Sequence, residues 1–402
     1  MTPAFLCDGI RTPIGRYGGV LANVRADDLG AIPIAALMAR NPSLDPAEID
    51  EVFYGCANQA GEDNRNVARM SLLLAGLPTS VPAVTVNRLC ASGLEALGAA
   101  ARAIGVGDID CAIAGGVESM SRAPLVMGKS AKAFGRDQQL MDTTMGWRFI
   151  NPALEAQYGC ETMPRTAENV AEAYDISRED QDSFALRSQH RARRAAERGF
   201  HLSEIVSVDV PGSRGGEAVT ITRDEHPRPD TDIETLNRLS PLFGSDGTVT
   251  AGNSSGINDG AAALLVASES AARRLGLTPR ARILGQASAG VAPRLMGIGP
   301  VASTQRLLQR LDMAIGDFDA IELNEAFASQ SIAVLRELGL ADDAEHVNAN
   351  GGAIALGHPL GMSGARLALT LVNQLEQTGG KKGLATMCVG VGMGLSLALE
   401  IV

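Results

Sequence analysis

Two stretches far apart in the chain, residues 90–120 and 361–393, follow the same order of residue types. Each begins with a small residue and has Ser and Gly at its third and fourth positions, continues through an apolar, helix-like run and a Gly- or Asp-containing turn, and ends in an apolar run with glycines. Such an internal similarity predicts two related halves packed back to back, with the starts of both helices near one centre.

Strand-like and helix-like segments alternate through the first 120 residues. Apolar or β-branched runs occupy residues 51–59, 83–90 and 109–120, and residues 95–105 have helical apolar spacing. This order predicts an α/β fold built from βαβ units, with a mostly parallel sheet covered by helices. The chain holds 45 glycines and only 3% aromatic residues, which favours close packing of helices on the sheet.

The composition of the sequence differs between about residues 119 and 248. This region is polar and interrupted by Pro and Gly, with amphipathic helices expected over residues 167–176 and 178–199. An excursion of that size typically forms a lid or a binding loop. We therefore predict an N-terminal half at 1–118 continued by 249–272, a loop domain at 119–248, and a C-terminal half at 273–402.

Composition narrows the classes of partner. The net charge of −11 argues against a nucleic-acid binder, which needs clustered positive charge. The basic run at 187–199 has helical spacing and is interpreted as a solvated helix face rather than a polyanion site. The N-terminal residues lack the pattern of a signal peptide, and no uninterrupted apolar segment is long enough to cross a bilayer, so we expect a cytoplasmic protein without membrane contact.

The six cysteines include no CxxC pair and have no metal-ligand spacing with the five histidines. We expect free thiols and no metal. Cys90, in "NRLCASG", follows an apolar run and precedes a helix. At such a turn the first amides and the helix dipole favour a thiolate and could hold an oxyanion, but a buried structural thiol is equally compatible with the position.

A nucleophilic cysteine needs a base, and His358 is the best candidate. It lies in "NANGGAIALGHPLGMSGAR", where glycines on both sides and Pro359 allow the imidazole to approach a ligand. Capping of the loop remains the alternative. The other four histidines lie in charged or loop-like sequence, where exposed or structural roles are expected: His190, His201, His226 and His346.

Three further segments could contribute polar groups. Cys388 lies in "MCVGVGMG", whose glycines do not match a dinucleotide-binding pattern and indicate close approach to a ligand, although a buried core thiol fits as well. Asn324 and Glu325 lie at the end of a predicted strand. There they could cap the following helix or serve as polar groups of an active site. "TAGNSSGINDGAA" offers small residues and amides for a polar chain, or an ordinary turn.

Taken together, these stretches resemble the thiolases, which are acyl-CoA:acetyl-CoA C-acyltransferases. The similarity spans the whole chain, in order: "RTPIGRYGG", "NRLCASG", "GGVESMSRAP", "AENVAE", "TAGNSSGINDGAAA", "NEAFA", "GGAIALGHPLGMSGAR" and "CVGVGMG". The resemblance implies the five-layered thiolase fold (α-β-α-β-α), with two βαβαβαββ halves and an inserted loop domain. It also implies a homotetramer as the expected assembly.

The resemblance assigns chemistry to individual residues. Cys90 would be the acyl-accepting nucleophile, His358 its base and Cys388 the group that protonates the departing acetyl-CoA carbanion. His358 and a water held by Asn324 would stabilise the enolate, and the amides of Cys90 and Gly390 the tetrahedral intermediate. Coenzyme A would be a co-substrate, with no permanently bound cofactor, and Ser255 and Arg228 would contact it.

"MDTTMGWRFINP", "QYGCETMPRTAEN" and "DQDSFALRSQ" resemble, more narrowly, the thiolases that cleave 3-oxoadipyl-CoA in bacterial aromatic degradation, by the β-ketoadipate or the phenylacetate route. Such a substrate has a terminal carboxylate that needs a cation or several hydrogen bonds. The candidates are Arg148, Arg165 and Lys129. The alternatives are a general 3-ketoacyl-CoA or acetoacetyl-CoA thiolase and, in another class, a non-catalytic CoA-binding protein of thiolase fold.

Overall fold

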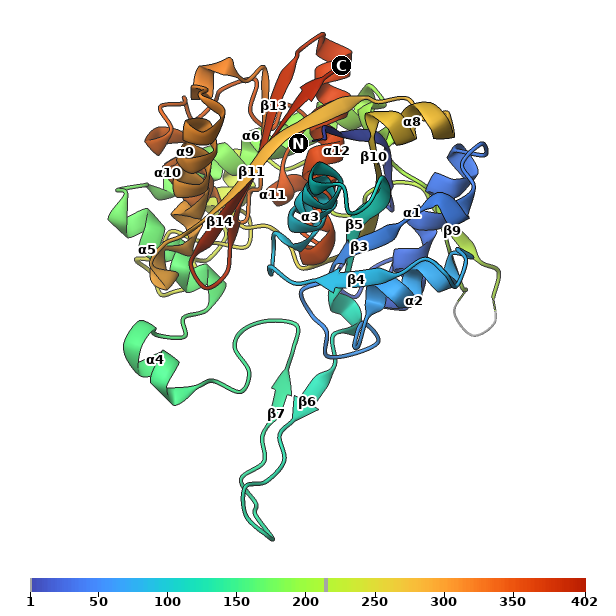
Figure 1. Ribbon diagram of the computed structural model, residues 1–402. Helices are drawn as coiled ribbons and strands as arrows, with labels where there is room; N and C mark the ends of the chain where they lie inside the picture. Colours follow the sequence, from blue (N-terminus) through green and yellow to red (C-terminus); the bar gives the residue numbers. More distant parts are fainter. Residues whose placement is uncertain (1, 213–215) are drawn as a thin grey trace.

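The computed structural model describes residues 2–212 and 216–402, so residues 213–215 of the predicted loop domain lie outside it. Two successive sets of elements have the same order of strands and helices (Figure 1). The first set is β1 (Ala4–Arg11), α1 (Ala26–Arg40), β3 (Glu51–Gly55), α2 (Val67–Leu74), β4 (Ala83–Val86), α3 (Ser92–Val106), β5 (Cys111–Ser119) and β10 (Asn258–Ser268). The second is β11 (Ala281–Gly290), α9 (Gly299–Leu311), β12 (Ala320–Leu323), α10 (Ala328–Glu337), α12 (Leu360–Thr378), β13 (Lys382–Val389) and β14 (Met393–Ile401).

The second set lacks a full strand before α12. An isolated bridge between Ile321 and Val347 stands at that place. With this bridge counted, both sets follow the order βαβαβαββ, as the resemblance implied. The expected helices and strands of the internal similarity are therefore present in both halves.

The strands form one large sheet in the order β12-β13-β14-β11-β1-β10-β5-β3-β4. A short pairing of Phe5 with Arg282 and Leu6 with Ala281 joins the halves through β1 and β11. The prediction of a mostly parallel sheet is wrong, because the sheet is mixed: β3 pairs in parallel with β4 and β5, and β12 with β13, whereas the pairs along the middle of the order are antiparallel. In the second half a short turn joins β13 to β14, so β14 returns antiparallel. In the first half β5 and β10 are also antiparallel, although the loop domain and its helices lie between them in the chain.

Helices α3 and α12 form the central layer between the two halves. They pack on each other and on strands of both halves, while α1 and α2 cover the outer face of one half and α9 and α10 that of the other (Figure 1). The core between these layers is rich in Ala, Leu and Val. This arrangement brings the first turns of α3 and α12 together.

Glycines allow this close approach. A side chain at Gly361, in the first turn of α12, would meet the Val117 carbonyl oxygen at 2.4 Å, and one at Gly116 would meet the Gly361 carbonyl oxygen at 2.0 Å. No β-carbon fits at such distances, so α12 lies directly on the backbone of β5. Glycines at the centre of the molecule therefore permit the close packing of helix on sheet that the composition predicted.

The segment between β5 and β10 contains small sheets and helices outside the two halves. Its elements are β6 (Leu125–Met127), β7 (Leu140–Asp142), α4 (Pro152–Tyr158), α5 (Met163–Ala173), α6 (Arg178–Glu197), β8 (Val208–Val210), β9 (Val219–Ile221) and α7 (Ile233–Asn237). The two expected amphipathic helices correspond to α5 and α6. The hairpin of β6 and β7 projects from the body of the protein, and α4 lies beside the same projecting region (Figure 1).

Short elements complete the described chain: β2 (Gly15–Arg16), α8 (Glu269–Leu275) and α11 (Ala353–Leu356). By length and composition, Leu89–Val106 is the one described helical segment apolar enough to cross a membrane. It consists of α3 and the turn before it, and Leu94, Leu97 and Ile104 are buried in the core. Its apolar character is therefore that of a central core helix.

Candidate active site

Cys90 lies in a tight turn between β4 and α3. The backbone φ of Leu89 is positive, at 48°, in a region that residues other than glycine rarely adopt. Two side chains hold this turn: Asn87 Oδ1 accepts the Leu89 N–H at 2.9 Å, and Ser92 Oγ accepts the Arg88 N–H at 2.9 Å and donates to the Leu89 carbonyl at 2.6 Å. The strained turn presents the cysteine at the start of α3, as the sequence predicted.

The Cys90 sulfur lies among groups from both halves. Its residue is half-buried, and burial raises the pKa of the thiol to about 11, although the backbone N–H groups of Gly390 and Cys90 itself favour the thiolate. The pKa of the fully buried Cys388 thiol is raised further, first by burial and then by the neighbouring Cys90. The structure therefore brings together Cys90, Cys388 and Gly390.

His358 directly precedes α12, and its imidazole is held in one orientation. The ring Nδ1 lies 2.6 Å from Ser363 Oγ, and the Ser363 hydroxyl donates to the Pro359 carbonyl at 2.7 Å. Because that hydroxyl has a single hydrogen, its oxygen can only accept from the ring, which places the imidazole proton on Nδ1. The Nε2 atom is then unprotonated, as a base requires, and its lone pair accepts from Asn324 Nδ2 at 3.3 Å.

The resting site is uncharged. Burial lowers the pKa of His358 to about 3, with a smaller contribution from Arg366, so the imidazole is neutral at physiological pH. The raised pKa of Cys90 and the lowered pKa of His358 both favour the uncharged forms of these side chains. The Gly390 and Cys90 amides that lie against the sulfur can also donate to an oxyanion formed there.

Asn324 lies beside the imidazole. Its Nδ2 is 3.3 Å from His358 Nε2, and its Oδ1 is buried and has no hydrogen-bond partner in the described part of the chain. A buried oxygen without a partner is uncommon and marks a place for a water or a ligand group. Glu325 has a different environment, because Ser188, Asn348 and the Ile354 N–H all donate to its carboxylate.

The two CoA candidates lie at different depths. The Ser255 N–H donates to the Ala326 carbonyl at 2.9 Å, and Ala326 packs in the same apolar cluster as Cys388, so Ser255 is close to the reactive groups. Arg228 is exposed on the loop domain, with its backbone N–H donating to Gln189 Oε1 at 2.9 Å. The geometry thus places one candidate near the centre and the other at the surface.

The three candidates for the substrate carboxylate are not equivalent. Arg148 is half-buried and close enough to Asp63 for its charge to lower the pKa of that carboxyl, although burial raises it overall. The Arg165 guanidinium lies over the Phe243 ring at 5.8 Å. Lys129 is exposed at the end of β6, on the projecting hairpin (Figure 1).

Sequence reasoning missed several residues that support the site. Asn258 Oδ1 accepts the His358 N–H at 2.8 Å, and Ser363 fixes the imidazole tautomer. Glu118 is fully buried and bonded to the backbone near His358, and burial lowers the pKa of His226, which lies beside Asn258, to about 4. Asn258, Ser363 and Glu118 belong to quoted motifs, but their partners are remote in sequence.

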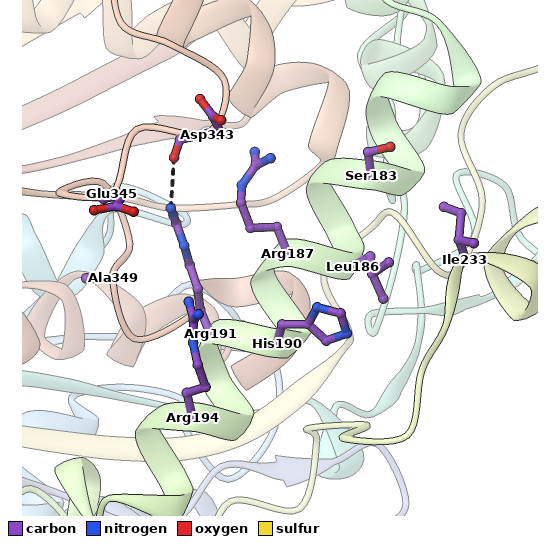
Figure 2. Close-up of a pocket in the computed structure, with 10 residues that line it drawn as sticks. All are labelled: Ser183, Leu186, Arg187, His190, Arg191, Arg194, Ile233, Asp343, Glu345 and Ala349. Carbon is purple, nitrogen blue, oxygen red and sulfur yellow. Dashed lines mark hydrogen bonds between the residues drawn. The ribbon is translucent and has the colours of Figure 1, made fainter.

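The basic run on α6 lines a separate groove of about 690 Å³ (Figure 2). Figure 2 shows Arg187, Arg191 and Arg194 with the loop that carries Asp343 and Glu345. The interpretation as a solvated face is wrong for Arg191, which is buried and donates to backbone carbonyls, including Asp343 at 3.0 Å and Val347 at 2.6 Å. Since Cys90, His358 and Cys388 are not among its lining residues, this groove is separate from the candidate active site.

Comparison with known proteins defines the class. Residues 4–270 match the thiolase N-terminal domain and residues 277–401 match the thiolase C-terminal domain, so the chain belongs to the thiolase family. A beta-ketoadipyl-CoA thiolase of Pseudomonas aeruginosa is 67% identical over 98% of both chains, and one of Pseudomonas putida is 64% identical over 100% of both. A 3-oxoadipyl-CoA/3-oxo-5,6-dehydrosuberyl-CoA thiolase of Escherichia coli is 63% identical over 100% of both chains.

Solved structures agree with this classification. The Bacillus anthracis acetyl-CoA acetyltransferase has a TM-score of 0.92 at 40% identity, and the human mitochondrial 3-ketoacyl-CoA thiolase has a TM-score of 0.92 at 38% identity. Each comparison covers 100% of this chain and 99% of the other. The predictions of the thiolase fold, the family and an acyltransferase class are confirmed.

Proposed function

We propose that this thiolase uses coenzyme A to cleave 3-oxoadipyl-CoA into succinyl-CoA and acetyl-CoA through an acyl-enzyme on Cys90. The observation that best supports this proposal is that Cys90 lies beside Cys388 and the Gly390 amide, where the first turns of α3 and α12 meet. The choice of substrate is supported by relatives of 63–67% identity that are named for the same reaction.

The first half of the reaction forms the acyl-enzyme. His358 Nε2 takes the Cys90 proton as the sulfur attacks the C3 carbonyl of the substrate, and the amides of Cys90 and Gly390 receive the oxyanion. The C2–C3 bond then breaks, and the electron pair leaves on the acetyl-CoA fragment as an enolate. Cys388 donates its proton to carbon, which gives acetyl-CoA, a Cys388 thiolate and a succinyl group on Cys90.

The second half returns the enzyme to its starting state. The Cys388 thiolate accepts the proton of the incoming CoA thiol, and the CoA thiolate attacks the succinyl carbonyl. Succinyl-CoA leaves as the Cys90 sulfur recovers its proton from His358.

Binding groups are proposed for the rest of the substrate. Asn324, whose Oδ1 has no partner in the described part of the chain, holds a water that donates to the enolate oxygen together with protonated His358. Ser255 contacts the pantetheine arm and the exposed Arg228 the adenine end. Coenzyme A is thus the co-substrate, and the mechanism uses no permanently bound cofactor.

Among the three carboxylate candidates, the surroundings favour Arg148. It is half-buried and its charge acts on Asp63, which neighbours Glu118, whose charge in turn acts on Cys90. Arg165 is occupied by stacking on Phe243, and Lys129 is exposed on the hairpin. We therefore propose Arg148 as the first of the three candidates for pairing with the substrate carboxylate.

Alanine variants of the three cations test this assignment against 3-oxoadipyl-CoA and its uncharged analogue 3-oxohexanoyl-CoA. Loss of a charge-assisted bond of about 1.5–3 kcal/mol corresponds to about a 10- to 100-fold lower kcat/KM. We expect Arg148→Ala to show this loss only with 3-oxoadipyl-CoA. An equal loss on both substrates would remove Arg148 from the role, and a selective loss in Arg165→Ala or Lys129→Ala would transfer it.

The proposed reaction itself is tested by CoA-dependent thiolysis of 3-oxoadipyl-CoA, acetoacetyl-CoA and medium-chain 3-oxoacyl-CoAs. We expect the highest kcat/KM with 3-oxoadipyl-CoA and a succinyl thioester on Cys90 by peptide mass spectrometry. A preference for acetoacetyl-CoA or a medium chain would replace the proposal by a general thiolase. A thioester on another residue would refute the assignment of Cys90.

We further propose a homotetramer in the cytoplasm. The projecting hairpin exposes large apolar side chains, which a partner subunit is expected to cover: Leu125, Met127, Phe134 and Leu140. Light scattering after size-exclusion chromatography should give four times the chain mass of 41.8 kDa. Replacing Leu125 and Met127 by Glu should lower that mass, and an unchanged tetramer would exclude the hairpin from the interface.

A further inference from the structure

One quoted motif, "GGVESMSRAP", has no part in the proposed reaction, and its glutamate lies next to the catalytic centre. Glu118 is fully buried near the end of β5. Its Oε2 accepts the Gly361 N–H at 2.7 Å and the Ala57 N–H at 3.0 Å, and its Oε1 accepts the Asn58 N–H at 2.9 Å. No cationic side chain in the described residues forms an ion pair with it, so three backbone amides, with the Cys56 thiol 3.9 Å from Oε1, surround this buried carboxyl.

The first of these donors belongs to the segment that carries the base. Gly361 lies three residues after His358, in the first turn of α12, where the helix dipole also favours a negative charge. A side chain at Gly361 would meet the Val117 carbonyl oxygen at 2.4 Å. The carboxylate and this direct backbone contact fix where α12 begins, and with it the position of His358.

The second donor leads to the nucleophile. The Ala57 carbonyl accepts from Asn87 Nδ2 at 3.1 Å, and Asn87 Oδ1 accepts the Leu89 N–H at 2.9 Å. Leu89 is the strained residue immediately before Cys90. A single carboxylate therefore connects the turn of Cys90, through Ala57 and Asn87, with the helix start of His358.

We propose that Glu118 is a positioning residue of the thiolase reaction, whose carboxylate holds the Cys90 turn and the start of α12 in register so that His358 Nε2 faces the Cys90 sulfur. This proposal rests on the catalytic roles proposed above for Cys90 and His358. It deepens them, because it explains how two groups from different halves are held at one spacing. Such precision matters, since a displacement of about 1 Å costs about 100-fold in rate.

The charge state of Glu118 gives the proposal a pH dependence. Burial raises the pKa of Glu118 to about 7 against the effect of the three N–H donors, and Asp63 contributes to the rise. The other groups that face it are Cys56, 3.9 Å from Oε1, and Cys90, while Arg148 acts on Asp63. As the pH falls through about 7, protonation removes part of the acceptor capacity and should loosen the centre.

A metal ion is not the better interpretation of this cluster. The ligand atoms of Cys56, Asp63 and Glu118 lie within 4.8 Å of one another. However, both Glu118 oxygens already accept N–H groups, whose positive ends would repel a cation. The carboxylate is thus placed to bind backbone.

Glu118→Gln tests the proposal, because it keeps the shape but replaces one acceptor oxygen by an amide that faces N–H donors. We expect kcat/KM for thiolysis to fall about 10- to 100-fold. In the wild type, kcat/KM should decrease as the pH falls below about 7, and this acid limb of the pH profile should be absent from Glu118→Gln. At the same time, iodoacetamide should alkylate Cys90 faster, since loss of the negative charge favours the thiolate. The pH profile separates this effect from a general loosening, which would also lower kcat/KM and expose Cys90 but would leave the acid limb in place.

Glu204→Gln is the matched control. Glu204 is also fully buried, but it binds Arg11, His201 and Asn373 instead of the catalytic turns. It should lower the melting temperature without changing the pH profile or the alkylation rate of Cys90. If Glu118→Gln behaves like this control, or keeps kcat/KM within twofold, the positioning role is refuted.

Glu118→Asp provides a second variant should the amide fail to fold. Its shorter carboxylate should keep the acid limb near pH 7 with a reduced kcat/KM, and a profile without that limb would overturn the proposal. Cys90→Ser separates this inference from the proposed function. Full thiolysis by Cys90→Ser would refute the acyl-enzyme, whereas its loss together with a normal Glu118→Gln would refute the positioning role alone.

Discussion

Ser363→Ala is the most direct test of how the base is prepared. The hydroxyl accepts the imidazole Nδ1–H at 2.6 Å and donates to the Pro359 carbonyl, so it fixes the tautomer in which His358 Nε2 is unprotonated. Without it, the Nδ1–H is buried with no acceptor, which costs about 1–3 kcal/mol. The other tautomer, protonated on Nε2, can instead donate to the unpartnered Asn324 Oδ1 after rotation of the amide.

This difference sets the size of the effect. A cost of about 1–3 kcal/mol corresponds to about a 5- to 150-fold loss of the active tautomer, since 1.4 kcal/mol is a factor of ten. We expect kcat/KM of Ser363→Ala to fall by that factor with little change in KM. Single-turnover acylation of Cys90 by a 3-oxoacyl-CoA, followed by mass spectrometry, should slow to the same extent, because the base acts in that step.

Ser331→Ala is the matched control. Ser331 is a buried helical serine whose hydroxyl donates at 3.0 Å to the carbonyl of Phe327, four residues earlier, as Ser363 does to Pro359. Both variants remove one buried hydroxyl, but only Ser363→Ala should slow acylation. A folded Ser363→Ala enzyme with kcat/KM within twofold of wild type would refute the tautomer argument.

Three further predictions follow from the same geometry. Cys388→Ser should slow carbon–carbon cleavage more than acylation of Cys90 by a simple acyl-CoA, and equal slowing in stopped-flow assays would contradict its proton-transfer role. Alkylation of Cys90 by iodoacetamide should rise steadily between about pH 6 and pH 9, because the thiolate fraction increases as the pH approaches the raised pKa of about 11; a plateau would indicate a preformed ion pair. Arg11→Leu should lower the free energy of unfolding by about 3–5 kcal/mol, because it removes the buried guanidinium that pairs with the Glu204 and Asp224 carboxylates, whereas Arg273→Ala on the surface should change it by less than about 1 kcal/mol in urea titrations.

The sequence predicted the elements of the fold better than their directions in the sheet. Apolar periodicity is local, so the helices near residues 95–105, 167–176 and 178–199 could be located without knowing their neighbours. Strand direction depends on the path that the chain takes between two paired strands, which apolar periodicity does not show. The chain returns from β13 to β14 through a short turn at 390–392, which makes that pair antiparallel although each strand alone resembles one of a parallel sheet.

In the candidate site, too, local sequence signals could be recognised but contacts between remote residues could not. Cys90 and His358 could be singled out because turn and glycine signals adjoin them in sequence. Their supports could not, since Asn258 lies 100 residues from His358, and Glu118 lies 243 residues from Gly361. Arg191 differs from the prediction for a related reason. Helical spacing indicates a basic helix face, but only the tertiary structure shows that backbone carbonyls bind the Arg191 guanidinium.

The internal similarity explains why the site lies where it does. α3 and α12 occupy equivalent places in the two halves, and each has a reactive residue two positions before its first helical residue: Cys90 before Ser92, and His358 before Leu360. The two helices approach closely because Gly93 has no side chain; a β-carbon there would lie 2.6 Å from the Gly361 carbonyl oxygen. A larger residue at that point would push the helix starts apart and separate sulfur from imidazole. In the proposed mechanism one repeated unit therefore supplies both the nucleophile and the base, and the glycines between the copies keep the two helix starts close together.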